Sequence, residues 1–247
     1  MEGLVNALKE VVNEVASYTD FMPNFSENLK LDSQSFDDAD KPINYGHNLR
    51  DANSTYEENG SIYETDDNGK PYKKDGEVLS NTSYEIDGNT YETDDNGKTY
   101  KKDGELLPNT DYEINGYKYE TDDKGRIISA EGTLHLSDTG RKTINEDNVG
   151  GEDKRETDDR GHLIADRFDG SNKIENLVPM DSNLNRGDFK KIENLLADAL
   201  ADGKEATLKV EPQYDGDSKR PSSFVVTYSI DGEEKVVVFS NERKDSE

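Results

Sequence analysis

Four consecutive residues, Asp159-Arg160-Gly161-His162, carry three of the groups that hydrolysis of a phosphodiester bond needs. A neutral histidine can take a proton from water near pH 7, because its unperturbed pKa is about 6.5. The Arg160 guanidinium can hold a phosphate through a forked, charged hydrogen bond. We expect Gly161 to let the backbone turn sharply and approach a bulky ligand. The chain has 3 histidines, so few residues compete with His162 for a proton-transfer role.

A second group of residues follows downstream at regular spacing. An Asn-Leu-Val-Pro segment begins at Asn176, Asn185 stands nine residues later, and Glu193 stands eight residues after Asn185. With the Asp-Arg-Gly-His segment, these residues resemble the DNA/RNA non-specific endonuclease family, a branch of the His-Me finger (ββα-metal) nucleases. The stretch 158–168 is similar to nuclease toxins of type VII secretion systems, the EssD-like group. The resemblance covers roughly residues 110 to 242.

The resemblance implies a role for each matched residue. His162 would be the general base that activates water, and Asn185 would be the protein ligand of one hydrated Mg²⁺, with Mn²⁺ as a substitute. One protein ligand suffices because Mg²⁺ gives up its waters reluctantly. Glu193 would accept a hydrogen bond from a metal-bound water, Asn176 would orient the region of His162 or Asn185, and Asp159 would support the turn. The scheme uses no 2′-hydroxyl, so DNA and RNA are both expected substrates.

The charge of the chain restricts how it can bind nucleic acid. The net charge is −26, and residues 110–247 alone carry 20 Lys+Arg against 32 Asp+Glu, a balance of −12. Any contact with phosphates must therefore be a local basic patch, so we expect weak non-specific affinity and a shallow salt dependence. The alternative is that these cations are solvated surface charges. The candidate substrate-binding residues are Arg160, Arg167, Arg186, Lys190, Lys219 and Arg220.

The sequence predicts that the chain divides into three regions. Hydrophobic residues make up 30% of the chain and charged residues 35%, too polar for one large core. Residues 1–53 are expected to hold an N-terminal amphipathic helix at 1–18, which packs locally or pairs with a partner helix, followed by a polar linker. Residues 54–110 are repeats, and residues 111–247 are the endonuclease domain.

A 28-residue repeat fills the middle region. Tyr56, Tyr84 and Tyr112 begin three copies, since 84 − 56 and 112 − 84 both equal 28. Each copy alternates short Tyr/Thr/Ile runs with Asp-Gly and Asn-Gly turns, which predicts a small β-meander. The copies would act as a spacer or sheet extension that duplicates the leading hairpin of the endonuclease domain. The alternative is a repeat that binds the cell wall, although such repeats depend on Trp, which this chain lacks.

The endonuclease region is predicted to have an α+β fold, with a ββα-metal core inside an antiparallel sheet. A strand is expected over residues 127–136, and a helix over Asp188–Asp202 that Gly203 ends. The residues expected on the apolar face of that helix are Phe189, Ile192, Leu195, Leu196, Ala199 and Leu200. A strand at 206–210, a loop at 215–221 and a hairpin over 222–239, turning at Asp231-Gly232, complete the region.

The leading hypothesis is an antibacterial nuclease toxin. No classical signal peptide is visible, so export would follow a type VII-like route, with secretion machinery or a chaperone as partner. The toxin would act in the target-cell cytoplasm without inserting into a membrane, and an immunity (antitoxin) protein would neutralise it in the producer. The alternatives are a nutritional or DNA-processing nuclease with the same chemistry, and a surface-binding repeat protein without catalysis.

Overall fold

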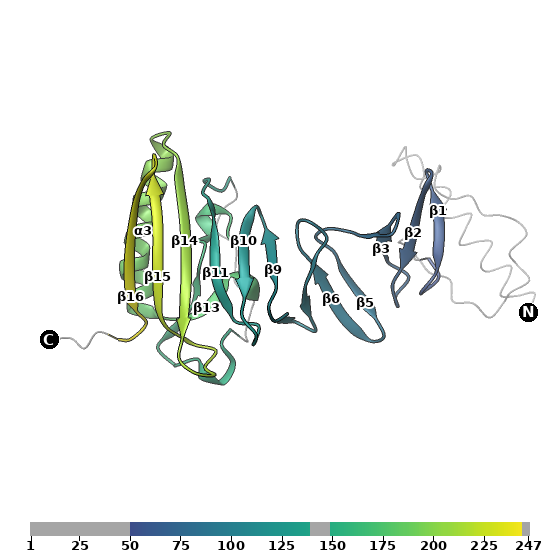
Figure 1. Ribbon diagram of the computed structural model, residues 1–247, viewed down its shortest axis with the longest axis horizontal. Coiled ribbons are helices and arrows are strands. Elements are labelled where there is room, and N and C mark those ends of the chain that lie inside the picture. Colours follow the sequence, from purple (N-terminus) through teal and green to yellow (C-terminus); the bar gives the residue numbers. More distant parts are fainter. Residues whose placement is uncertain (1–49, 139–148, 244–247) are drawn as a thin grey trace, which may run out of the picture. The chain divides into compact units, whose positions relative to one another are not determined.

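The computed structural model describes residues 50–138 and 149–243, which are built mostly from antiparallel strands (Figure 1). Within these ranges the strands form four sheets, and α3 (Lys190–Ala201) is the longest helix. This confirms the predicted combination of antiparallel sheets with a helix. The predicted helix at 1–18 and nearly all of the predicted linker lie outside the described residues. None of the described helices has the length and apolar character needed to cross a membrane.

The two upstream copies of the repeat each fold as a four-stranded antiparallel meander. Tight turns join the first two strands of each copy, where Asn59-Gly60 and Asp87-Gly88 both have positive φ at the two central positions. Asn, Asp and Gly tolerate this left-handed conformation, which explains the predicted hairpins. The strands of the two copies are β1 (Thr55–Glu58), β2 (Ser61–Thr65), β3 (Pro71–Lys74) and β4 (Glu77–Val78), then β5 (Ser83–Ile86), β6 (Asn89–Thr93), β7 (Thr99–Lys102) and β8 (Glu105–Leu106).

Neighbouring copies are joined by hydrogen bonds to an Asp-Asp pair. Asp66 Oδ2 accepts a hydrogen bond from the Glu85 N–H at 2.9 Å, and the Asp67 N–H donates to the Glu85 carbonyl at 2.9 Å. The buried Asp66 carboxylate also accepts from two N–H groups of its own turn through Oδ1. Each joint therefore satisfies backbone groups of two copies at once. The same bonds recur 28 residues later, from Asp94 and Asp95 to Glu113.

The third copy opens the largest sheet, which has six strands. The strand order is β16-β15-β14-β11-β10-β9, so β11 joins the third copy to the C-terminal strands. The turn at Asp231-Gly232 is confirmed, with φ of 50° and 82°. The strand predicted at 206–210 continues to residue 214. The strands are β9 (Asp111–Ile114), β10 (Tyr117–Thr121), β11 (Ile127–Thr133), β14 (Ala206–Tyr214), β15 (Pro221–Ile230) and β16 (Glu233–Ser240).

The helix α3 packs on one face of this sheet, and Figure 1 shows it behind β14, β15 and β16. Leu196 is fully buried, and Phe189 contacts Phe224 edge-on with ring centroids 5.3 Å apart. Leu195 is 43% exposed, so its predicted place on the apolar face is wrong. The predicted stop is confirmed, because Gly203 has φ of 80° and the Lys204 N–H donates to the Ala199 carbonyl.

A separate two-stranded sheet carries the Asp-Arg-Gly-His segment. Strand β12 (Asp158–His162) pairs antiparallel with β13 (Leu177–Asp181). The predicted turn at this segment is therefore wrong, and Gly161 has a different purpose. A Cβ on Gly161 would lie 2.6 Å from the Met180 Cβ, closer than van der Waals contact allows. The glycine admits the side chain of a neighbouring strand.

The helical segment after β13 begins earlier than predicted. It starts with α2 (Ser182–Leu184), continues as a π-helical turn η5 (Asn185–Phe189), and becomes α3. Asp181 caps the first turn, because its side chain accepts a hydrogen bond from the Asn183 N–H at 3.0 Å. The sequence predicts a start at Asp188 because the apolar periodicity begins only with Phe189. The cap at Asp181, seven residues before that start, carries no such periodic signal.

Candidate active site

A cleft of about 1040 Å³ lies where β12, the loop that follows it and the helical segment meet. It is lined by five Lys/Arg residues and four Asp/Glu residues, so this cleft departs from the acidity of the whole chain, which carries −26. A basic balance at one place is what binding of a phosphate backbone requires. The charged lining residues are Lys154, Asp158, Asp159, Arg160, Asp166, Arg167, Arg186, Lys190 and Glu193, and His162 and Asn185 line the cleft beside them.

The His162 ring is held by a side chain that sequence reasoning did not identify. His162 Nε2 lies 2.5 Å from Asn172 Oδ1, and the Asn172 amide nitrogen donates to Asp166 Oδ1 at 2.7 Å. An ionised carboxylate can only accept, so Asp166 fixes which end of the Asn172 amide faces it. The amide oxygen then faces the ring and requires Nε2 to donate. In the neutral imidazole this leaves Nδ1 as the basic nitrogen.

Asp159 ties the start of the π-helical turn to β12. Its Oδ2 accepts hydrogen bonds from Asn185 Nδ2 at 2.9 Å and from Arg186 Nε at 2.8 Å, and its Oδ1 accepts from Arg186 Nη2 at 2.6 Å. Partial burial raises the pKa of Asp159, but the hydrogen bonds from Arg186 and Asn185 outweigh it and hold that pKa below its ordinary value. Asp159 thus joins β12 to the helical segment, and it does not support a turn as we expected.

The π-helical turn separates Asn185 from Glu193 on the helical axis. Asn185 is the first residue of that turn, and Glu193 lies in the first turn of α3. A π turn bonds i to i+5, so the angular relation between these two residues is not that of a regular α-helix. Both side chains nevertheless line the cleft, and Glu193 Oε2 accepts a hydrogen bond from Lys190 Nζ at 2.8 Å.

The oxygen donors of the cleft suit a hydrated hard cation. Asp159 accepts a hydrogen bond from the Asn185 amide nitrogen, so the Asn185 Oδ1 points away from Asp159. This oxygen can serve as a neutral ligand of a metal ion. Glu193 adds a carboxylate, and Mg²⁺ prefers such oxygen ligands while keeping several waters. Among residues 50–138 and 149–243, no group of three or more His, Cys, Asp or Glu could hold a metal ion by itself. Asn185 and Glu193 offer two oxygen donors, so a hard cation held by them would keep most of its water.

Asn176 lies outside the cleft, fully buried beneath the loop that follows β12. Its side chain accepts from the Ile164 N–H at 2.9 Å and donates to the carbonyls of Ile164 (2.7 Å) and Ser171 (2.8 Å). These bonds close the loop into a compact shape. Gly170 makes that closure possible, because a Cβ there would lie 1.9 Å from the Ile164 carbonyl oxygen. Asn176 thus holds the backbone of this loop between Ile164 and Ser171.

Two of the six predicted phosphate-binding residues do not line the cleft. Arg220 is 6% exposed, and its guanidinium donates hydrogen bonds of 2.8 and 2.9 Å to Asp158. The guanidinium is therefore buried and does not line the cleft. Lys219 lies away from the cleft, with Nζ 3.7 Å from Glu105 Oε2. The four that line the cleft are Arg160, Arg167, Arg186 and Lys190, and Lys154 joins them without having been predicted.

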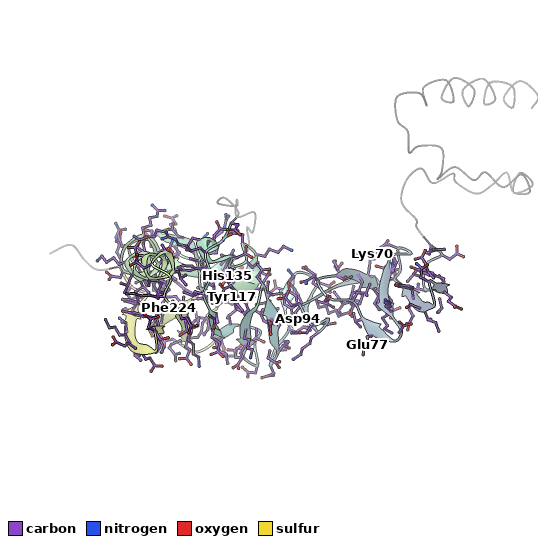
Figure 2. The ribbon with its side chains drawn as sticks, turned by 90° about the horizontal axis from the view of Figure 1, so that it is seen from above. Lys70, Glu77, Asp94, Tyr117, His135 and Phe224 are labelled. Atoms are coloured by element: carbon purple, nitrogen blue, oxygen red, sulfur yellow. The ribbon has the colours of Figure 1, made fainter. Side chains whose placement is uncertain are left out.

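His135 is the second histidine among the described residues, and it has no place in the cleft. Its ring stacks on Tyr117, with centroids 5.7 Å apart and planes 7° from parallel. Both residues are labelled in Figure 2. Tyr117 also donates a 2.6 Å hydrogen bond to the Phe168 carbonyl. This bond ties Tyr117 to the segment that carries the cleft residues Asp166 and Arg167. His162 is thus the histidine that faces the charged cleft.

Comparisons with known proteins identify proteins to which this chain is similar. The model of the family described as DNA/RNA non-specific endonuclease matches residues 108–232, which is more than half of the chain. The type VII secretion system protein EssD of Staphylococcus aureus, in strains USA300 and NCTC 8325 / PS 47, is 40% identical over 109 residues. That match covers 42% of this chain and 18% of the relative, so the chain spans under a fifth of the relative's length. A solved structure, described as Sda1 nuclease with bound zinc ion, aligns at 17% identity and a TM-score of 0.42, covering 51% of this chain and 75% of that one.

Proposed function

The chain belongs to the DNA/RNA non-specific endonuclease family, and from that premise we propose that it is a metal-dependent endonuclease that cuts DNA and RNA without sequence specificity. The observation that carries the proposal is the bonded series His162–Asn172–Asp166 at the wall of a locally basic cleft. In this proposal β12, β13 and the helical segment from Ser182 form the ββα-metal core of the family.

His162 is the general base of the proposed reaction. The Asn172 amide oxygen keeps the Nε2 proton in place, so Nδ1 is the nitrogen that takes a proton from the attacking water. Asp166 holds Asn172 in the orientation that this requires. General-base help of this kind is typically worth about 10²–10⁴-fold in rate. The water then attacks phosphorus and the 3′ oxygen departs.

Asn185 and Glu193 are the residues that would hold the metal, Asn185 directly and Glu193 through water. The divalent ion, Mg²⁺ or Mn²⁺ as its substitute, supplies positive charge against the negative charge that builds on the phosphate oxygens. Asp159 keeps Asn185 in position, because it accepts the hydrogen bond from its amide nitrogen. The substrate phosphates are held by Arg160, with Arg167, Arg186, Lys190 and Lys154 along the cleft.

The proposal is tested by plasmid and RNA degradation with purified protein. We expect cleavage of both substrates with Mg²⁺, none with EDTA, and a loss of at least about 10²-fold in His162→Ala. His135→Ala is the matched control, because its ring packs outside the cleft, and it should cleave as the wild type does. Wild-type protein that is folded and loaded with Mg²⁺ yet leaves both substrates intact would refute the function.

For the biological role we propose a toxin exported by a type VII-like route and restrained in the producer by an immunity protein. The supporting observation is the 40% identity to a protein named for the type VII secretion system. Expression in a bacterial cytoplasm should kill the cell, and His162→Ala should abolish killing while the protein accumulates to the same level. If the wild type is harmless but cleaves DNA in vitro, the toxin role fails and the chemistry stands.

A further inference from the structure

A lysine of the second repeat is buried against the endonuclease core. Lys101, on β7, has a side chain only 5% exposed, and its Nζ lies 2.9 Å from Glu92 Oε1 and 3.6 Å from Glu175 Oε2. The residue lies before the family match, which begins at residue 108. Among the described residues, the equivalent lysine one period earlier, Lys73, forms an ion pair only with Glu64 of its own hairpin and is 29% exposed. The contact with Glu175 is therefore an addition made by the second copy.

Glu175 needs this cation. Its side chain is 3% exposed, and within the described residues Oε2 has no hydrogen-bond partner, so Lys101 supplies the opposing charge. A buried carboxylate without a nearby cation is strongly disfavoured and must move or take up a proton. The backbone of Glu175 is held by Tyr112, whose Oη donates to the Glu175 carbonyl at 2.9 Å.

Glu175 in turn holds the loop that orients His162. Its Oε1 accepts a 2.6 Å hydrogen bond from Ser171 Oγ, and the Ser171 carbonyl accepts from Asn176 Nδ2 at 2.8 Å. The next residue, Asn172, is the one whose amide oxygen faces His162 Nε2. Lys101 is thus connected to the His162 ring in three steps. They are its ion pair with Glu175, the Glu175–Ser171 hydrogen bond, and the contact between His162 and Asn172, the residue after Ser171.

We propose that Lys101 is a positioning residue for catalysis, and that the second repeat is a working part of the endonuclease. The inference rests on the proposed role of His162 as the base. Lys101 holds the Glu175 carboxylate in place, Glu175 holds Ser171, and Ser171 holds the neighbouring Asn172. Loss of the cation releases the loop and lets the imidazole leave the geometry that proton transfer needs.

The test compares Lys101→Met with Lys73→Met, the same substitution at the same position of two near-identical copies. We expect Lys101→Met to lower kcat by about ten-fold or more with little change in KM, and to alter the acid limb of the pH–rate profile. Lys73→Met should leave kcat, KM and the profile at wild-type values. Adding Glu175→Gln to Lys101→Met should restore most of kcat, because an amide oxygen accepts from Ser171 without needing a cation.

Ser171→Ala provides a second test that removes only one hydroxyl. It should lower kcat and alter the same acid limb while circular dichroism and the melting temperature show a folded protein. The inference is overturned if Lys101→Met and Ser171→Ala both keep the wild-type kcat and profile, or if Lys101→Met fails to fold while Ser171→Ala is fully active. Inactive wild-type protein would instead refute the proposed function itself.

Discussion

At the scale of single residues, the cleft shows how one fixed amide determines the protonation of a ring. Asp166 can only accept, Asn172 must then present its oxygen, and His162 must then donate from Nε2. Asp166 thus influences which nitrogen carries the proton through the Asn172 amide. Substitutions at Asn172 should therefore change catalysis more than folding.

Replacement of Asn172 by alanine should lower kcat by roughly 10–100-fold, because the ring loses the partner that selects its tautomer. Steady-state cleavage of a fluorescent duplex would measure this. Asn194→Ala is the control, since Asn194 bonds a cleft cation, Arg167, and not the histidine. A kcat for Asn172→Ala equal to that of the control would remove Asn172 from the mechanism.

The pair of Asp159 and Arg186 should give the folded state a recognisable pH dependence. The pKa of Asp159 is lowered on folding, so the stabilisation is fully present above about pH 3.9, the unfolded value, and disappears as the pH falls through the folded pKa. Melting temperatures of wild type and Asp159→Asn should thus differ near neutral pH and converge in acid. Arg186→Gln should reproduce the pattern, and a difference that grows toward low pH would contradict it.

At the scale of elements, the sequence predicts the features that depend on one or two neighbouring residues. It does not predict those that depend on contacts between distant residues. The Asp231-Gly232 turn and the stop at Gly203 depend on the conformation of one or two residues, so the sequence predicts them. The sequence predicts a turn where the structure has the strand Asp158–His162, because the reason for its glycine is Met180 on another strand. Likewise, the chemistry of Arg220 points to phosphate until its partner Asp158, 62 residues away, is seen.

Gly161→Ala tests this interpretation of the strand. The new methyl would lie 2.6 Å from the Met180 Cβ, and overpacking of this kind typically costs about 1–3 kcal/mol of folding free energy. Gly187→Ala is the matched control, since nothing lies within 4 Å of a Cβ there and the helical backbone should gain about 0.4–1 kcal/mol. Urea unfolding of both variants would measure the contrast. Equal stabilities would mean that β12 and β13 are not packed as described.

At the scale of the whole molecule, an acidic protein carries a small basic site. The net charge of −26 opposes approach to nucleic acid, while five cations line the cleft. Two of them, Arg186 and Lys190, are already paired with Asp159 and Glu193. Affinity must therefore come from few phosphate contacts, and the acidic remainder of the surface limits non-productive binding.

The dependence of binding on salt should accordingly be shallow. If two or three phosphates are neutralised, log K against log salt has a slope of roughly −2 to −3. Fluorescence anisotropy with a short duplex and metal-free protein would give this slope. Lys190→Gln should reduce its magnitude by about 0.9, and Lys219→Gln, outside the cleft, should not change it. A wild-type slope near −8 would indicate a much larger contact surface than the cleft.

The joint between repeat copies has a consequence for inheritance. Because Asp66 meets Glu85 as Asp94 meets Glu113, a chain that gains or loses 28 residues presents the same two surfaces at every junction. Exchange between near-identical copies therefore yields another foldable chain, provided that the copy carrying Lys101 stays next to the third copy. The length of this region is thus free to vary among descendants, in whole copies, while the cleft stays as it is.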